Sequence, residues 1–348
     1  MIRIGKHEVG EGAPPFIIAE MSGNHNGSLS RALEIVDAIA ASGAHALKLQ
    51  TYTADTMTID VAEREFVIRN PESPWFGRNL HALYEEAHTP WKWHKPLFQR
   101  AREHGLAAFS SAFDGTAVDF LESLDVPAFK IASFENRDLD LIRRVARTGK
   151  PVIISTGLAT LAEIDAAVRA VHEAGGHDLV LLKCTSNYPA DPSSSNLRTI
   201  PYLRDLYRCE VGLSDHTLGI AVATASVACG ATVIEKHVTL DRASGGVDST
   251  FSLEPPELKQ LVESCRMAWL ALGSVQTLPT AEEIPSLVFR RSLYVCTDLA
   301  AGDALTRENL RAIRPGNGLP PQHLSMLLGK RVNRTVPRGT PMSWDLIG

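Results

Sequence analysis

Residues that could carry acid–base, anion-binding or metal chemistry stand at the ends of eight short apolar segments of the chain. They are Glu20, Lys48 with Gln50, Ser110 with Ser111, Lys130 with Ser133, Ser155, Lys183, Ser214 with His216, and Lys236 with His237. Lysine and serine side chains bind phosphate and carboxylate groups, a carboxylate can transfer protons, and neutral imidazoles bind divalent metals. Gathered at one place, these residues would make an enzyme that handles an anion and has a site suited to a metal.

The segments that carry these residues are near-continuous apolar runs, each followed by an amphipathic helical stretch. The runs span residues 16–20, 45–50, 106–110, 128–133, 151–155, 179–184, 210–214 and 232–237. Such runs are typical of parallel strands buried on both faces. Eight strand–helix units predict an α/β protein with a (β/α)8 TIM barrel, whose strands all end on the face where these barrels do chemistry.

Two regions fall outside this alternation. The insertion over 51–89 is long for a compact domain, and its aromatic residues Tyr52, Trp75, Phe76 and Tyr84 suit a wall over the barrel mouth. From about residue 288 the pattern changes to short β-like runs that alternate with GD, RPGNGLPP and RGTP turns. We predict a barrel domain over 1–272, a linker over 273–287 and a small β-rich domain over 288–348.

Composition excludes several classes of partner. The 348 residues carry a formal net charge of −5 without a basic tract, which argues against binding to nucleic acid. The five cysteines are scattered and form no CxxC pair, as expected for reduced thiols in a reducing compartment. No signal-peptide core and no apolar run of about 18 residues is present, so we expect a cytoplasmic protein without a membrane partner.

The two strand-end histidines and the strand lysines each allow more than one interpretation. His216 and His237 end neighbouring strands of a closed barrel and so predict a divalent-metal site, although one such histidine alone would be an ordinary hydrogen-bonded side chain. Lysine is rarely buried unless paired, and Lys48 and Lys130 with nearby serines suggest a phosphate and carboxylate cradle. The alternatives are ion pairs that staple the barrel, above all for Lys183 and Lys236, or one lysine that forms a Schiff base.

Two carboxylates are further candidates. Glu20 ends the first strand directly before an SGNHNG turn, where it could orient a hydroxyl group or transfer a proton, or only balance the charge of Lys48. Asp248 lies in the GGVDS segment just past the eighth strand, where it could reach a polyhydroxylated ligand.

With these residues in place, the chain resembles the sialic acid synthases, a family that condenses phosphoenolpyruvate with an amino-sugar aldehyde to make nonulosonic acids. The matching stretches are IIAEMSGNHNGS, ALKLQTYTADTMT, FSSAFD, FKIAS, IISTG, LLKCTSNYPA, VGLSDHT, VIEKHVTL and SLEP, and the C-terminal part resembles the family's SAF, or antifreeze-like, domain. The segments TYTADTMT, KIASFEN and GGVDSTFSLEP are most similar to the pseudaminic acid branch. That branch implies 2,4-diacetamido-2,4,6-trideoxy-L-altrose as the sugar, with the N-acetylneuraminate and legionaminate branches as alternatives.

The resemblance also implies roles for individual residues. Glu20, Lys48 and Lys130 would be catalytic, and His216 and His237 would bind a divalent metal, Mn2+ first, with Mg2+ or Co2+ as alternatives. The residues implied to bind phosphoenolpyruvate are Lys48, Ser111, Lys130, Ser155, Ser186, Asn187 and Ser214. Ser186 stands where a relative has asparagine, so either it or Asn187 would contact the phosphate. The residues implied near the sugar are Gln50, Glu135, Tyr188, Asp248 and Arg314.

Arg314 has a separate implication for assembly. In the family, the matching arginine is inserted over the sugar by the SAF domain of the neighbouring subunit, which implies a domain-swapped homodimer. Two rival functions are a Schiff-base aldolase that uses pyruvate on the same barrel, and a non-catalytic protein whose SAF domain recognises glycans.

Overall fold

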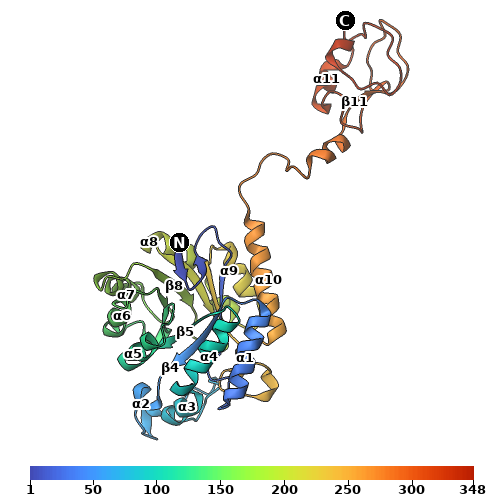
Figure 1. The fold of residues 1–348 in the computed structure, drawn as a ribbon. Coiled ribbons are helices and arrows are strands. Elements are labelled where there is room, and N and C mark those ends of the chain that lie inside the picture. The colour runs from blue at the N-terminus through green and yellow to red at the C-terminus, as the bar shows by residue number, and fades with distance from the viewer. The chain divides into compact units, whose positions relative to one another are not determined.

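The computed structural model describes residues 1–348. The chain forms two compact units, 1–273 and 274–348 (Figure 1). The first unit is a closed barrel of eight parallel strands in the order β10-β3-β4-β5-β6-β7-β8-β9, which confirms the predicted TIM barrel. The strands are β3 (Phe16–Glu20), β4 (Ala46–Thr51), β5 (Ala107–Ala112), β6 (Phe129–Ile131), β7 (Val152–Ser155), β8 (Leu179–Cys184), β9 (Glu210–Asp215) and β10 (Val233–His237).

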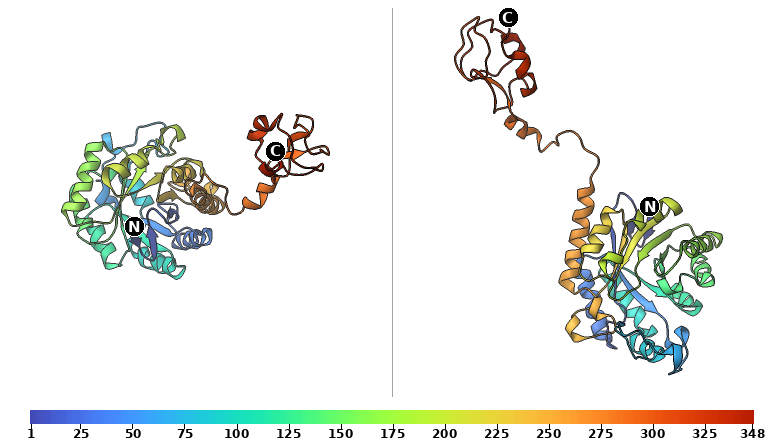
Figure 2. Two further views of the ribbon diagram at one scale, coloured as in Figure 1. Left: turned by 90° about the horizontal axis from the view of Figure 1, so that it is seen from above. Right: turned by 180° about the vertical axis from the view of Figure 1, so that it is seen from behind.

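Helices cover the outside of the barrel, as the view along it shows (Figure 2). They are α1 (Leu29–Ser42), α4 (Trp91–Glu103), α5 (Gly115–Ser123), α6 (Leu139–Ala146), α7 (Leu161–Glu173), α8 (Thr199–Tyr207), α9 (Ala221–Ala228) and α10 (Pro255–Leu272). Local sequence sets their ends: the Ser28 hydroxyl accepts a hydrogen bond from the Arg31 amide at the start of α1. Gly43 ends the same helix at a φ of 83°, a left-handed conformation that favours glycine. No helix is both long and apolar enough to cross a bilayer.

Two further segments close the ends of the barrel. The antiparallel hairpin of β1 (Ile2–Ile4) and β2 (His7–Val9) packs into the barrel core, and the His7 ring lies 5.4 Å from the Phe16 ring at the start of β3. At the opposite end, the insertion after β4 holds α2 (Ala54–Met57), a 3-10 turn at Arg64–Phe66 and α3 (Leu80–Ala87). The N-terminal ends of the strands are therefore plugged, and the C-terminal ends carry the added loops.

One predicted strand is shorter than expected. The segment 128–133 forms a strand only over β6, because Ser133–Glu135 already turns as a 3-10 helix. The turn carries Glu135 away from the barrel wall and into the space above the strand ends.

The second unit has its own small core. Its strands β11 (Ser292–Val295) and β12 (Leu310–Ile313) pair antiparallel, and its one short α-helix is α11 (Leu324–Leu327). Buried Leu293, Leu310 and Val332 belong to this core. Residues 271–286, which include most of the predicted linker, are exposed throughout.

Gly212 in the middle of β9 allows β9 and β10 to approach each other. A Cβ atom at this position would lie 2.1 Å from the carbonyl oxygen of Val233 in β10, far inside van der Waals contact. These two strands carry Ser214 and His237, and His216 directly follows β9, so the spacing of the strands sets where these three side chains lie at the mouth of the barrel.

We predict that Gly212→Ala lowers the free energy of unfolding by about 3 kcal/mol, because the added methyl group must push two buried strands apart. Gly115→Ala is the matched control, since its methyl group would meet only the flexible end of the Arg144 side chain at the start of α5. Denaturant unfolding of both variants measures the difference, and equal stability of the two would contradict the prediction.

Candidate active site

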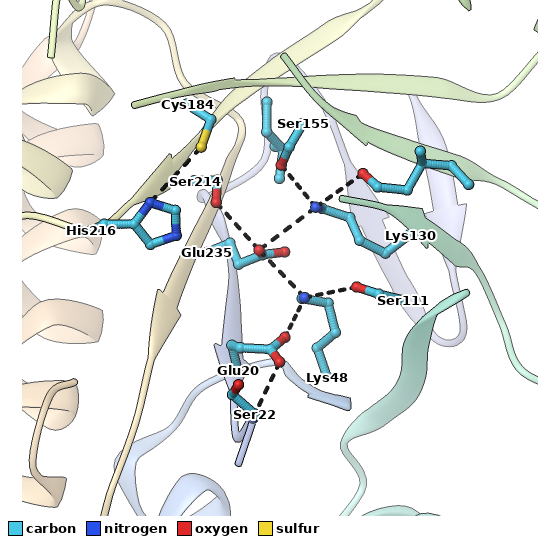
Figure 3. Close-up of polar contacts among 12 residues, drawn as sticks. Glu20, Ser22, Lys48, Ser111, Lys130, Ser155, Cys184, Ser214, His216 and Glu235 are labelled. Atoms are coloured by element: carbon cyan, nitrogen blue, oxygen red, sulfur yellow. Dashed lines mark hydrogen bonds and ion pairs between the residues drawn. The ribbon is translucent and has the colours of Figure 1, made fainter. Parts of the chain in front are cut away.

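Four charged side chains lie together, almost completely buried, at the C-terminal ends of the strands (Figure 3). The exposed fractions of Glu20, Lys48, Lys130 and Glu235 are 0%, 3%, 1% and 4%. Lys48 Nζ contacts the Glu20 carboxylate and lies 3.5 Å from Oε1 of Glu235. Lys130 Nζ lies 3.8 Å from the same Oε1 atom. Two lysines and two carboxylates thus form one buried ion-pair network with Glu235 between the lysines.

Serine hydroxyls from three more strands complete this arrangement. Lys48 Nζ donates to Ser111 Oγ at 3.1 Å, and Lys130 Nζ donates to Ser155 Oγ at 2.7 Å. Ser214 Oγ donates to Glu235 Oε1 at 3.3 Å. We call these two lysines and three serines the lysine cradle. The structure therefore brings together five of the residues that the sequence predicts to hold an anion.

Glu235 is the member of the network that the sequence reasoning missed. It stands beside Lys236 and His237, which drew attention because of their charge and their metal chemistry. The period-two alternation of a strand could have found it, since Glu235 and His237 face the same side of β10 and Lys236 faces the other.

The other two strand lysines lie outside the cradle. Lys236 Nζ bonds Asp215 Oδ2 at 2.9 Å and the carbonyl oxygen of Thr217 at 2.6 Å, so Lys236 staples β10 to the end of β9 and the loop that follows it. Lys183 Nζ donates to Thr185 Oγ1 at 2.7 Å and to the carbonyl oxygen of Cys184 at 3.2 Å. The stapling interpretation is therefore correct for Lys236, and Lys183 is tied to its own loop.

Burial opposes ionisation of each charged group in the network. Burial raises the pKa of Glu20, and the neighbouring Lys48 only partly offsets this effect. Burial also acts on Glu235, but the nearby Lys130 and Lys48 outweigh it and lower the pKa of that carboxyl group. Burial lowers the pKa of Lys130. The two carboxyl groups therefore differ, and Glu235 is the more readily ionised of the pair.

A cavity of about 600 Å3 opens at the same end of the barrel. The predicted sugar residues of the barrel all line it, namely Gln50, Glu135, Tyr188 and Asp248. Ser186 and Asn187 also line it, whereas the cradle residues do not. The structure thus separates an open cavity from the buried cradle. Arg314 lies in the second unit, directly after β12, and its predicted role stays a prediction.

His216 and His237 are neighbours, as predicted, with ring centroids 5.4 Å apart. His216 Nδ1 lies 3.0 Å from the carbonyl oxygen of Thr185, so this nitrogen carries a hydrogen. Burial acts to lower the pKa of His216, but the hydrogen bond with Cys184 outweighs it and raises that pKa. His237 Nδ1 is buried without a hydrogen-bond partner and lies 3.6 Å from Asp248 Oδ2. Burial lowers the pKa of His237 well below its usual value, which keeps the ring neutral, the form that binds metals.

This pair suits a metal that is only partly enclosed by protein. No group of three or more His, Cys, Asp or Glu side chains anywhere in the chain is arranged to hold a metal ion. A metal held by His216 and His237 would therefore have water or substrate oxygen atoms at its remaining positions, as catalytic sites require.

Comparison with known proteins agrees with this geometry. The NeuB family profile matches residues 35–277, and the SAF domain profile matches residues 290–348. The chain belongs to the NeuB family. This confirms the resemblance drawn from the sequence motifs and the SAF character of the C-terminal part.

Within the NeuB family, relatives match nearly the whole chain. Pseudaminic acid synthase of Campylobacter jejuni is 41% identical over 93% of this chain and 94% of its own length. N,N'-diacetyllegionaminic acid synthase of Legionella pneumophila is 40% identical over 95% of this chain and 94% of its own length. The crystal structure of N-acetylneuraminic acid synthetase from Leptospira borgpetersenii in complex with citrate superposes with a TM-score of 0.73 at 32% identity, over 82% of this chain and 94% of that one.

We predict that Glu235→Ala lowers the free energy of unfolding by about 3 kcal/mol, because it leaves Lys130 without its buried counter-charge. Asp119→Asn, which removes only the exposed ion pair with Arg144, is the control and should change stability far less. Denaturant unfolding measures both variants. Equal losses of unfolding free energy in the two variants would contradict the prediction that the buried ion pairs stabilise the fold more than an exposed one.

The carboxyl group of Glu135 provides a pH-dependent prediction. Burial raises its pKa to about 7, so its proton stabilises the fold at low pH and this contribution is lost as the pH rises through about 7. Glu135→Gln should therefore be more stable than the unmodified protein by about 1–3 kcal/mol at about pH 8 and equally stable at about pH 4, below the ordinary pKa of the carboxyl group. Thermal unfolding at both pH values measures this difference, and a gain of the same size at each pH would contradict it.

Proposed function

We propose that this NeuB family chain is a pseudaminic acid synthase. It condenses phosphoenolpyruvate with 2,4-diacetamido-2,4,6-trideoxy-L-altrose and releases phosphate by cleavage of a C–O bond. The observation that carries the proposal is the buried lysine cradle beside an open cavity, which provides an anion site next to a sugar site. The likeness of GGVDSTFSLEP to the pseudaminic acid branch and the Campylobacter jejuni relative support the choice of sugar.

The cradle suits the two anionic groups of phosphoenolpyruvate. Lys48 and Lys130 each offer an ammonium group with three donors, and Ser111, Ser155 and Ser214 add hydroxyl groups at the same depth. When phosphoenolpyruvate binds, the lysine and serine donors exchange their present partners within the protein for its phosphate and carboxylate oxygen atoms. Charge-assisted bonds of this kind are stronger than neutral ones and hold the reactive carbon in a fixed orientation.

The reaction then makes a C–C bond and a C–O bond to water, and breaks the C–O bond to phosphate. C3 of phosphoenolpyruvate attacks the aldehyde carbon, water adds at C2, and the resulting tetrahedral intermediate loses phosphate together with its bridging oxygen. Lys48 and Lys130 stabilise the negative charge of the departing phosphate in a site closed to bulk water. Glu20 positions the aldehyde or moves a proton at its oxygen. Gln50, Glu135, Tyr188 and Asp248 line the cavity that receives the sugar.

A divalent metal, with Mn2+ as the first choice and Mg2+ or Co2+ as alternatives, would be held by His216 and His237 and would polarise the aldehyde as a Lewis acid. Asp248 supports this pair, since its carboxylate lies 3.6 Å from His237 Nδ1 and accepts a hydrogen bond from Ser22. The centroid of the Tyr188 ring lies 4.4 Å from that of the His216 ring, so Tyr188 limits the movement of His216.

The proposal extends to assembly and location. Arg314 lies in the SAF domain, and the family resemblance supports a domain-swapped homodimer in which it reaches the sugar site of the other subunit. The five free cysteines support a reducing compartment such as the cytoplasm. The second candidate function is a legionaminic acid synthase, favoured by the Legionella pneumophila relative of nearly equal identity.

We expect the protein with Mn2+ to release phosphate from phosphoenolpyruvate when the trideoxy-altrose sugar is present, and not with N-acetylmannosamine or the legionaminate precursor. A colorimetric phosphate assay with each sugar in turn measures this. Release with the legionaminate precursor alone would transfer the assignment to the second candidate. If the folded protein failed to release phosphate with any of the three sugars, a synthase function would be refuted.

We expect His216→Ala to lower turnover by about 100-fold or more, since a lone histidine cannot hold the metal. The fold should survive, because the His216 ring makes hydrogen bonds only with the Thr185 carbonyl oxygen and the Cys184 thiol. His177→Ala, at an exposed histidine, is the matched control and should keep full activity. Turnover and thermal unfolding are measured on both variants, and near-normal turnover of His216→Ala would remove the metal from the mechanism.

A further inference from the structure

The insertion after β4 forms about half of the lining of the cavity, although no residue of it belongs to the barrel strands. Its helices α2 and α3 lie together beside the C-terminal ends of the strands (Figure 1). The insertion residues that line the cavity include Tyr52, Ile68, Trp75, Leu83 and Tyr84. The cavity is therefore built about half from the barrel and half from this insertion.

Trp75 lies at the tip of a tight loop within this insertion. The Ile68 amide donates to the carbonyl oxygen of Arg78 at 2.9 Å, and the Gly77 amide donates to that of Ile68 at 2.8 Å. The Arg78 amide donates to the carbonyl oxygen of Trp75 at 3.1 Å and closes the tip. Arg78 also forms an ion pair with Glu86 of α3. The backbone that carries the indole ring is thus held on both sides.

The indole ring connects this loop to two loops of the barrel. Trp75 Nε1 donates a hydrogen bond of 2.9 Å to the carbonyl oxygen of Val247, the residue directly before Asp248. The indole ring also lies 5.7 Å from the ring of Tyr188. Asp248 and Tyr188 both line the cavity, so Trp75 contacts the two barrel loops that present polar groups to a sugar.

The cavity that Trp75 lines has a mixed wall, in which Asn70, Glu72 and Ser73 of the same loop are polar and other members are apolar. Met57, Ile68, Leu83 and Phe113 line the cavity with it, whereas Gln50, Glu135 and Asp248 supply polar groups. The proposed sugar has the same division, because each of its two acetamido groups ends in a methyl group and its C6 is itself a methyl group, while its hydroxyl and amide groups need polar partners. N-acetylmannosamine has a hydroxymethyl group at C6, and burying that hydroxyl group against the apolar part of the wall is unfavourable.

We propose that Trp75 is a specificity-determining residue that selects methyl-bearing diacetamido sugars over sugars with a C6 hydroxyl group. Its ring belongs to the apolar part of the wall of the sugar site, and its hydrogen bond to Val247 keeps that part in register with Asp248. This inference rests on the proposed function, since it assumes that the cavity binds the sugar and the cradle binds phosphoenolpyruvate. Trp75 does not contact the cradle, so it should affect the sugar without affecting the anion.

The test compares Trp75→Ala, Trp75→Phe and a control variant in phosphate release. Phe76→Ala is the matched control, because Phe76 is the next residue of the same loop tip, is 57% exposed and does not line the cavity. For the diacetamido sugar, Trp75→Ala should raise KM by about 10–100-fold, a range typical of lost pocket contacts. KM for phosphoenolpyruvate should stay within about twofold, and phosphate release with N-acetylmannosamine should become detectable in Trp75→Ala.

Trp75→Phe separates the ring from its hydrogen bond. It keeps an aromatic wall but cannot donate to Val247, so it should show an intermediate KM for the sugar. If Trp75→Ala does not fold, as circular dichroism would show, Trp75→Phe decides the question by the same comparison with Phe76→Ala.

The outcomes distinguish this inference from the proposed function. An unchanged sugar KM in a folded Trp75 variant, or equal rises in KM for the sugar and for phosphoenolpyruvate, would overturn the role of Trp75 while the synthase function stands. If the unmodified protein uses the legionaminate precursor instead, the same comparison with that diacetamido sugar supports or overturns the inference. Failure of the unmodified protein to release phosphate with any of these sugars would overturn both the proposed function and the role of Trp75.

Discussion

The buried ion-pair network at the barrel mouth is the constraint on which the rest of the structure depends. Transferring four charged groups from water into a protein interior costs several kcal/mol for each, and only close pairing offsets that cost. Lys48 and Lys130 are both almost completely buried and both face Glu235, so no one of the three can be removed without leaving an uncompensated charge. The barrel must therefore hold these strand ends within a few ångströms of one another.

The closed barrel provides that closeness through its strand order. Glu20 pairs with Lys48 across β3 and β4, and Ser111 pairs with Lys130 across β5 and β6. Glu235 comes from β10, which closes the barrel against β3, and its contact with Lys130 crosses the interior of the barrel. Charged and hydroxyl side chains from strands far apart in the sequence thus meet at one level inside the barrel. The insertion and the loops add a second layer, in which the cavity is formed.

Much of this arrangement could be predicted from the sequence, because buried parallel strands are nearly continuous apolar runs in which a lysine or a histidine is conspicuous. The pattern predicted the barrel, the cradle and the pairing of His216 with His237. Glu235 was missed because attention went to residue type rather than to the alternation that puts it inside. Lys236 has the same residue type as Lys130 but faces outward, and only its contact with Asp215 shows that difference.

The loops could not be predicted in the same way, because no periodic pattern sets their direction. Trp75 and Phe76 are adjacent aromatic residues of the insertion, and both were expected to form a wall over the mouth. Trp75 lines the cavity, whereas Phe76 is exposed. Ser186 and Asn187 both line the cavity, so the structure does not choose between them as the phosphate contact. The place of Arg314 depends on assembly, which a single chain does not define.

The central claim is that the cradle holds phosphoenolpyruvate for cleavage of its C–O bond. The most direct test uses phosphoenolpyruvate labelled with oxygen-18 in the bridging position, with the diacetamido altrose sugar and Mn2+, and mass spectrometry of both products. We predict that the label leaves with phosphate and that the oxygen at C2 of the sugar acid comes from water. Label retained in the sugar acid would mean that the P–O bond breaks, and would contradict this account of the site.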